Sequence, residues 1–327
     1  RPLLTLLIND AAGGDWRQAV PAASAIEILH NFSLVHDDIQ DASETRRGRE
    51  TLWRLWGKPL AINTGDAMFA MAHLGLNLLI DREVPAGVVV RALRRFDETC
   101  VELTQGQHAD MCFETRDNVS TAEYLAMIRG KTDVLIALSA ELGALVAGAN
   151  DEHIAHYAAF GRDLGLAFQI EDDILGIWGD ESMTGKSAAS DIITRKKSLP
   201  VLYGLNKSAD LRALYSQTMA EAEFVPQAVA ELNHTGAREY AADLTIHKKT
   251  VLTLARPVTF ALKTSCGTLR PNQVILRPNR RRQNRHRHRR PNRHRYHLPI
   301  AYPRRHLHHR QFRRRSLSLQ SGVTKGA

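Results

Sequence analysis

The chain has 327 residues and a formal net charge of +9 that averages two unlike parts. Residues 251–327 contain 20 Lys and Arg side chains and no Asp or Glu, so residues 1–250 keep 24 basic and 35 acidic side chains, a net charge of −11. Charged and polar residues interrupt every apolar run, which excludes a predicted membrane span, and three cysteines form neither a metal-binding nor a disulfide pattern. We therefore expect a protein of the reducing cytoplasm with an acidic folded part and a basic tail.

Helical periodicity dominates the acidic part from its start. Apolar helical patterns cover residues 20–40, 61–80, 86–114, 134–149 and 153–177, and weaker ones continue to about residue 249. Residues 61–80 are apolar on most faces and predict a buried central helix. Because no alternating strand pattern or repeat interrupts these segments, we predict an all-α bundle around a central cavity.

Three carboxylates end the first long helix. Asp37, Asp38 and Asp41 occupy positions i, i+1 and i+4, which lie on one side of a helix. Packed like charges are costly unless a cation neutralises them, and all-oxygen ligation suits Mg²⁺. Taken alone, the pattern is equally consistent with a solvated acidic helix end.

A second acidic cluster, Asp172 and Asp173, follows Gln169 on the helix at 153–177. Basic residues flank both clusters in the sequence; they are Arg46, Arg47, Lys131, Lys186 and Lys196. Two acidic clusters that share metal ions and are ringed by Lys and Arg predict a binding site for a diphosphate.

These residues belong to an ordered series of short motifs across residues 1–250. The series reads Arg1-Pro2, Asp37-Asp38-Ile39-Gln40-Asp41, Thr45-Arg46-Arg47-Gly48, Gly65-Asp66-Ala67, Gly106-Gln107 with Asp110, Gly130-Lys131-Thr132, Phe168-Gln169 with Asp172-Asp173, Gly185-Lys186, and Asp191 through Lys196 to Leu199-Pro200. In order and spacing it resembles the trans-isoprenyl diphosphate synthase (polyprenyl synthetase) family, and most of all its short-chain geranylgeranyl diphosphate synthases.

The resemblance implies a fold and a reaction. The fold is the class I terpenoid synthase bundle, usually a homodimer. The reaction is the Mg²⁺-dependent, head-to-tail condensation of isopentenyl diphosphate with an allylic diphosphate. The expected product is geranylgeranyl diphosphate, with farnesyl diphosphate as the alternative.

The resemblance also implies the metal ligands and the catalytic residues. Asp37 and Asp41 would bind two Mg²⁺ ions from one wall of the site and Asp172 a third from the other, with Asp38 and Asp173 as accessory carboxylates. Oxygens of Thr132 and Gln169 would face the carbocation, and Lys131 and Lys196 would complete the catalytic set.

Two groups of cations would hold the two substrates. By resemblance, the allylic diphosphate would contact Arg46, Lys131, Lys186 and Lys196. The isopentenyl diphosphate would contact Arg1, His30 and Arg47, without a metal ion. We expect no nucleic acid partner for the folded part.

Two further positions affect the product and the metal site. Bulky Phe32 and small Ser33, just before the first acidic cluster, would set the floor of the cavity and hence the chain length of the product. Gly176 stands where the family has a third Asp in the second cluster, which we expect to weaken metal binding without abolishing it, with Asp180 compensating.

We predict a domain boundary near residue 253. Residues 1–253 would form the synthase domain, shortened at its N-terminus because the family has a Lys three residues before the position of Arg1. Residues 254–327 are rich in Arg, His and Pro and predict a disordered tail. A non-native C-terminus is the favoured interpretation, with a tail for nucleic acid or anionic membrane as the alternative.

Three alternative functions stay open. A terpene cyclase of the same fold would not need Arg1, Arg46, Arg47 and Lys196 together. A non-catalytic or regulatory subunit of a heteromeric synthase would not need both acidic clusters. An anion-binding protein would depend on the tail.

Overall fold

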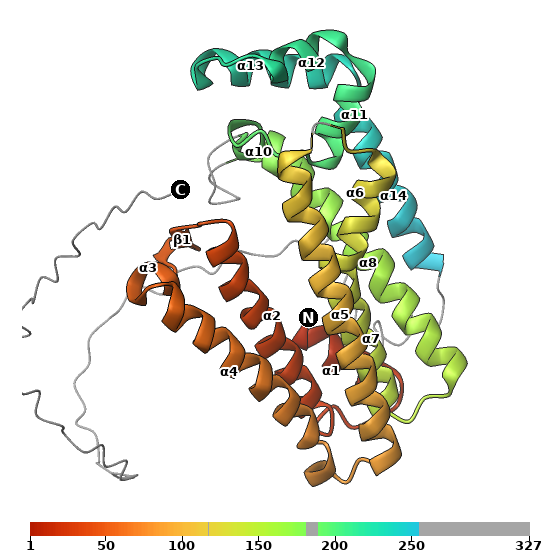
Figure 1. The fold of residues 1–327 in the computed structure, drawn as a ribbon. Coiled ribbons are helices and arrows are strands. Elements are labelled where there is room, and N and C mark those ends of the chain that lie inside the picture. Colours follow the sequence, from red (N-terminus) through yellow and green to blue (C-terminus); the bar gives the residue numbers. More distant parts are fainter. Residues whose placement is uncertain (117, 181–188, 255–327) are drawn as a thin grey trace, which may run out of the picture. The chain divides into compact units, whose positions relative to one another are not determined.

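The structure is a computed structural model that describes residues 1–116, 118–180 and 189–254 (Figure 1). The chain divides into two units, Arg1–Gln273 and Val274–Ala327, and every described residue belongs to the first. The predicted tail after residue 254 and the predicted site residue Lys186 lie outside the described residues. No helix of the described segments is long and apolar enough to cross a membrane.

The described part is helical apart from its turns and one short hairpin, which confirms the predicted all-α class. Its first half contains α1 (Pro2–Ala11), α2 (Val20–Gln40), α3 (Leu52–Trp56), α4 (Lys58–Asn77), the 3₁₀ turn η1 (Ile80–Arg82) and α5 (Ala86–Thr115). Its second half contains α6 (Thr121–Ile128), the π-helical turn η2 (Arg129–Asp133), α7 (Val134–Val146), α8 (Asp151–Trp178), α10 (Ser190–Ile193), α11 (Leu199–Lys207), α12 (Ala209–Ser216), α13 (Glu221–His234) and α14 (Ala237–Leu254). In Figure 1, α2, α4, α5, α7 and α8 lie side by side, and α12 and α13 cross one end of this bundle.

Local signals explain where several of these helices begin. Ser120 and Glu123 form a reciprocal capping box at the start of α6, and the Asn150 side chain caps α8. Proline occupies the first turn of α1, α2, α4 and α11, where its missing N–H costs nothing. Each cap fixes the start of a helix that later carries a residue of the candidate site.

The central helix is α7 and not the segment 61–80, so that prediction was wrong. Every residue of α7 from Leu135 to Val146 is buried, whereas α4 buries only Ala61, Gly65, Ala72 and Leu76. The outward face of α4 is apolar as well, with Met71, Leu74 and the C-cap residue Leu78 more than half exposed. A helix that is apolar on all faces can therefore be either fully buried or exposed on one apolar face, and the sequence pattern did not distinguish the two.

Helix α8 links the hydrophobic core from end to end. Tyr157 near its start packs in the cluster shared by α2, α5 and α7, Ile170 in a second cluster with α6 and α11, and Ile177 in a third with α12 and α13. Asp172 and Asp173 lie between Ile170 and Ile177. The second acidic cluster is thus fixed by packing on both sides along the helix.

A β-hairpin follows α2, although the sequence showed no strand pattern. Strands β1 (Thr45–Arg46) and β2 (Arg49–Glu50) pair antiparallel, with Arg46 opposite Arg49. The two turn residues, Arg47 and Gly48, both have positive φ angles of 54° and 73°, as a tight hairpin turn requires. Strands of two residues are too short for alternation to appear in the sequence, and the hairpin returns Arg46 towards the end of α2.

Candidate active site

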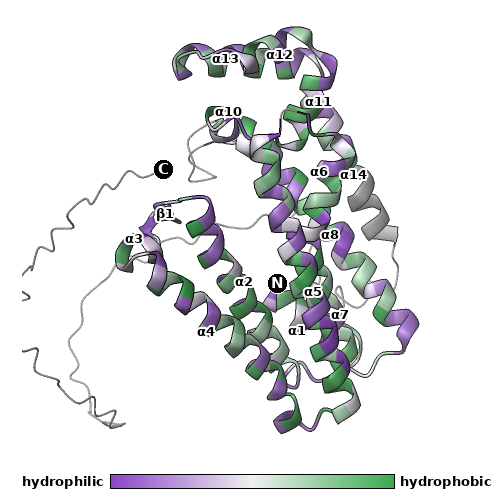
Figure 2. Cartoon of the chain, in the orientation of Figure 1, coloured by the Kyte–Doolittle hydropathy of each residue, from purple (hydrophilic) through white to green (hydrophobic). Residues whose placement is uncertain are grey.

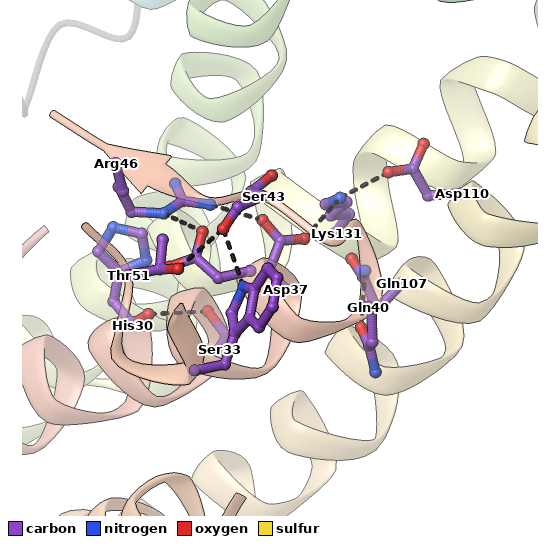
Figure 3. Close-up of polar contacts among 12 residues, drawn as sticks. His30, Ser33, Asp37, Gln40, Ser43, Arg46, Thr51, Gln107, Asp110 and Lys131 are labelled. Atoms are coloured by element: carbon purple, nitrogen blue, oxygen red, sulfur yellow. Dashed lines mark hydrogen bonds and ion pairs between the residues drawn. The ribbon is translucent and has the colours of Figure 1, made fainter. Parts of the chain in front are cut away.

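The first acidic cluster lies at the C-terminal end of α2, under the hairpin (Figure 3). Arg46 donates from Nε to Oδ1 of Asp38 (2.7 Å) and from Nη2 to Oδ2 of Asp37 (3.0 Å). Burial raises the pKa of Asp38, and the hydrogen bond and charge of Arg46 oppose this shift. Asp41, the residue that ends the helix, is exposed. The structure therefore joins Asp37, Asp38 and Arg46 in one ion-paired group.

The loop that carries the hairpin is held by backbone carbonyls, among them that of Ser43. Ser43 O accepts hydrogen bonds from Thr51 Oγ1 (2.8 Å, Figure 3) and from Trp53 Nε1 (2.9 Å). These contacts tie the residues before β1 to those after β2. The position of Arg46 over the aspartates is thereby fixed by the loop as well as by its own ion pairs.

Lys131 joins the same group from the opposite side. Its Nζ lies 3.2 Å from Asp37 Oδ1 and 2.5 Å from Oδ2 of Asp110 on α5 (Figure 3). Although burial acts in the opposite direction, the carboxylates of Asp110 and Asp37 raise the pKa of Lys131 above its usual value. Asp110 was part of the matched motif, but no role was predicted for it.

Two glycines and a π-helical turn place Lys131. A Cβ on Gly106 of α5 would lie 2.3 Å from the backbone N of Lys131, and one on Gly130 would lie 3.0 Å from Gly106 Cα. Only glycine permits this approach of α5 and η2. The π-helical turn adds a residue to the helix at this point, as such turns do at many functional sites.

The second acidic cluster uses its two aspartates differently. Asp172 is exposed, whereas Asp173 is 1% exposed and accepts three hydrogen bonds. The donors are Tyr124 Oη (2.6 Å), Gln169 Nε2 (3.1 Å) and the backbone N of Leu199 (3.2 Å). Burial raises the pKa of Asp173, while the Lys196 charge and these donors oppose the shift. Asp173 is occupied by protein donors, so of the two aspartates Asp172 is the better placed to bind a ligand.

Gln169 connects this cluster to η2. Thr132 Oγ1 donates to Gln169 Oε1 at 3.0 Å, and Thr132 itself is 9% exposed. The two residues predicted to face the carbocation are therefore in direct contact, and Asp173 extends the chain of hydrogen bonds. Tyr124 was missed, because a lone Tyr on an amphipathic helix gives no signal in the sequence.

Lys196 stands among the acidic residues of the site. The charges of Asp191, Asp173 and Asp110 raise its pKa against the effect of desolvation. Its neighbour Arg195 has a φ of 52° and donates to the backbone oxygens of Tyr215 in the last turn of α12 (2.6 Å) and of Gln217 just after it (2.8 Å). The Arg195 guanidinium also lies 4.1 Å from the ring centroid of Phe224 on α13.

Arg1 and His30 form a separate polar pair. Arg1 Nη1 donates to His30 Nε2 at 3.0 Å, and burial, together with the charges of Arg1 and Arg47, lowers the pKa of His30 to about 4. His30 is thus a neutral acceptor. Arg47, in the hairpin turn, is exposed. The three residues predicted for one substrate lie in one neighbourhood.

The two residues predicted to set product length lie on α2 just before Asp37. The ring of Phe32 contacts His36 edge-on (centroids 4.7 Å apart) and Phe69 of α4 (5.1 Å). Phe69 in turn contacts His73, which contacts Phe96 of α5. Ser33 Oγ donates to His30 O at 2.8 Å. Phe32 therefore belongs to an aromatic layer that spans α2, α4 and α5.

Gly176 packs against a carboxylate. A Cβ at this position would lie 2.6 Å from Cγ and Oδ2 of Asp191, which is itself 9% exposed. The helix thus has a glycine where the Asp191 side chain needs the space. The predicted compensation by exposed Asp180 stays a prediction.

Comparison with known proteins agrees with the motif series. The protein-family model described as polyprenyl synthetase matches residues 1–232. A (2E,6E)-farnesyl diphosphate synthase of Mycobacterium bovis is 48% identical over 203 residues, which are 62% of this chain and 55% of that protein. The chain thus spans about half the length of this curated relative.

Two further proteins align with this chain over a larger share of their own length. A geranylgeranyl pyrophosphate synthase of Geoglobus acetivorans is 40% identical over 243 residues, 74% of this chain and 75% of that protein. A solved structure of geranylgeranyl pyrophosphate synthase from Corynebacterium glutamicum, complexed with isoprenyl diphosphate and magnesium, is 25% identical. It aligns with a TM-score of 0.70 over 81% of this chain and 85% of that chain.

Proposed function

Because the chain belongs to the polyprenyl synthetase family, we propose that it condenses isopentenyl diphosphate with an allylic diphosphate to give a short-chain prenyl diphosphate. The observation that carries the proposal is the meeting of Asp37, Asp38, Arg46, Lys131 and Asp110, drawn from α2, the hairpin, η2 and α5. Alternating carboxylates and cations suit a substrate that carries its own negative charge together with divalent metal ions.

Asp37, Asp41 and Asp172 are the residues that would hold Mg²⁺, with three ions in the full site. Their carboxylate oxygens are the hard ligands that Mg²⁺ prefers, and Asp41 and Asp172 are exposed. The described residues contain no cluster of three or more His, Cys, Asp or Glu side chains arranged for a metal. Mg²⁺ commonly takes one or two carboxylates and completes its shell with water and substrate phosphate, so the donor set fits. Bound Mg²⁺ would act as a Lewis acid that stabilises the negative charge on the departing diphosphate.

The cations around the aspartates would bind the substrates. Arg46, Lys131 and Lys196 would hold the allylic diphosphate, with Lys186 as a further contact. Asp37 pairs with both Arg46 and Lys131, and Asp110 pairs with Lys131. These ion pairs would hold the two cations in position before a diphosphate binds. Arg1, His30 and Arg47 would bind isopentenyl diphosphate, and neutral His30 orients the Arg1 guanidinium.

Thr132 and Gln169 would stabilise the carbocation that ionisation leaves behind. Both offer oxygen atoms that are poor nucleophiles, and their mutual hydrogen bond holds them close together. The departing diphosphate is the proposed acceptor of the final proton. We propose geranylgeranyl diphosphate as the product, with farnesyl diphosphate as the alternative.

We propose a homodimer that covers the apolar outer faces of α4 and α5. Figure 2 shows apolar stretches along both helices. Met71 and Leu74 of α4 and its C-cap residue Leu78 follow helical spacing, and Val90 and Val101 on α5 are 66% and 59% exposed. Exposed apolar side chains that gather on neighbouring helices are typical of an interface. The cytoplasm is the proposed location, because free Cys100 and Cys112 suit a reducing compartment.

The test is incubation of the purified chain with isopentenyl diphosphate and each of dimethylallyl, geranyl and farnesyl diphosphate, with and without Mg²⁺. We expect a Mg²⁺-dependent product of defined length. Binding of a diphosphate without any product would overturn the proposal in favour of a non-catalytic subunit. Conversion of an allylic diphosphate alone to a hydrocarbon would favour a terpene cyclase.

A further inference from the structure

Tyr124 makes a buried contact that the proposed reaction does not explain. This residue of α6 is 3% exposed, and its hydroxyl lies 2.6 Å from Oδ2 of Asp173 on α8, 49 residues away in the sequence. Burial, and then the Asp173 charge, raise the pKa of Tyr124 well above its usual value. The phenol therefore keeps its proton and is the donor in this hydrogen bond.

Asp173 is held from several directions at once. Oδ2 also accepts from the backbone N of Leu199, the first residue of α11. Oδ1 faces the side-chain NH₂ group of Gln169, and Oδ2 faces the Tyr124 hydroxyl and the Leu199 N–H. Both carboxylate oxygens therefore act as acceptors in these contacts.

The contact with Gln169 sets how its amide is turned. Oδ1 of Asp173 accepts from the Gln169 NH₂ group at 3.1 Å, so the amide oxygen faces the other way. There it accepts from Thr132 Oγ1 at 3.0 Å. A flipped amide would set Oε1 against the Asp173 carboxylate and its NH₂ group against Thr132.

We propose that Tyr124 is a positioning residue that acts through Asp173 to keep the Gln169 amide oxygen on the side of Thr132. The inference rests on the proposed function, in which this oxygen stabilises the carbocation. Without the Tyr124 hydroxyl, the donors that remain to Asp173 among the described residues are Leu199 N and Gln169, and its rotamer is no longer fixed from the α6 side. The Gln169 oxygen then spends less time in the productive orientation, which affects the transition state more than the binding of diphosphate.

The kinetic test compares Tyr124→Phe with a matched control, Tyr157→Phe. Tyr157 is also a buried tyrosine, 6% exposed, but it packs in the core cluster shared by α2, α5 and α7. We expect Tyr124→Phe to lower kcat about tenfold with the KM of both diphosphates within about twofold, the pattern of a lost transition-state interaction. Tyr157→Phe should keep both constants.

A double variant separates positioning from general stability. If Tyr124 acts through Gln169, adding Tyr124→Phe to Gln169→Leu should cause no further loss of kcat. The proposal would be overturned if the double variant lost kcat by the product of the two single losses, or if Tyr124→Phe alone left kcat unchanged.

A measurement without substrate keeps the test independent of the proposed reaction. In the full chain labelled with ¹⁵N-glutamine, the side-chain amide signals of Gln169 are those missing from Gln169→Leu. We expect them to shift in Tyr124→Phe and in Asp173→Asn, and to stay in place in Tyr157→Phe. Unchanged signals in Tyr124→Phe would refute the positioning role whether or not the chain forms product. Shifted signals in a chain without synthase activity would uphold the contact and refute the proposed function instead.

Discussion

Asp37 is paired through both of its carboxylate oxygens, one with Arg46 and the other with Lys131. The sequence predicted all three residues as members of one site, because the motif series joins them. It did not predict that Asp110 would share Lys131, nor that Asp173 would be enclosed by Tyr124 and Leu199. Such partners come from helices far apart in the chain, and no local pattern records them.

Gly176 offers a stability prediction at a single position. In an open helix, replacing Gly by Ala stabilises by up to about 1 kcal/mol. At Gly176 the new Cβ would lie 2.6 Å from Asp191 Cγ, so we expect Gly176→Ala to lower the free energy of unfolding by about 1–3 kcal/mol. Urea unfolding of the parent protein and of the variant measures this difference.

The matched control is Gly87→Ala in the first turn of α5, where nothing lies within 4 Å of the added Cβ. This variant should be as stable as the parent or more so. Equal stability of the two variants would show that Asp191 can move aside, and the addition of a carboxylate by Gly176→Asp would then become a fair test of metal binding.

His30 makes stability depend on pH. Its pKa is about 4 in the folded protein and near 6.5 when unfolded, so the unfolded state binds more protons between these values. The free energy of unfolding should therefore fall as the pH drops from 6.5 to 4, by roughly 2 kcal/mol after allowance for the partly exposed ring. The variant His30→Gln, which keeps an acceptor for Arg1, should lose this part of the slope. Identical slopes, in denaturant titrations at several pH values, would contradict the assigned environment of His30.

At the scale of the elements, helices were predictable and their contacts were not. The segments 20–40, 86–114 and 153–177 were predicted within a few residues of α2, α5 and α8, because long amphipathic patterns are strong signals. The central position of α7 and the close crossing of α5 and η2 were not, since they depend on which apolar faces meet. The hairpin escaped notice because two-residue strands carry no periodicity.

The aromatic layer between α2 and α4 carries a prediction about product length. Phe32 fills the contact with Phe69 and His36, so Phe32→Ala should open space below the first acidic cluster. We expect longer prenyl products from this variant, analysed by chromatography after extended incubation with isopentenyl diphosphate. Phe160→Ala provides a control, because Phe160 packs against the same core from α8. An unchanged product from Phe32→Ala would refute Phe32 as the floor.

At the scale of the whole molecule, the wrong prediction for residues 61–80 has a physical reason. Their apolar character on all faces correctly indicated that little of α4 suits water, but the residues that the structure describes cover only one side of it. The sequence of one chain does not state whether the other side is covered by the same chain or by a second copy. The proposed dimer supplies the missing cover.

Leu74 tests that proposal. This residue on the outer face of α4 is 63% exposed, and Leu3 on α1 is 65% exposed. A charged group in an apolar interface is costly, so Leu74→Glu should shift the protein from dimer to monomer, whereas Leu3→Glu should not. Sedimentation velocity at several concentrations distinguishes the two states. A monomeric parent protein would refute the interface outright.

The contacts of Arg195 have a consequence for the local unfolding of the protein. Through its bonds to the Tyr215 and Gln217 carbonyls and its contact with Phe224, Arg195 joins the backbone beside Lys196 to the outer helices α12 and α13. Proteins exchange amide hydrogens through contiguous cooperative units, and these segments should form one such unit. Amides of α12 and of residues 195–199 should then exchange with a shared opening free energy, which Arg195→Gln would lower for both. Local unfolding of α12 and α13 would thus lower the fraction of time that Lys196 spends in its position in the site.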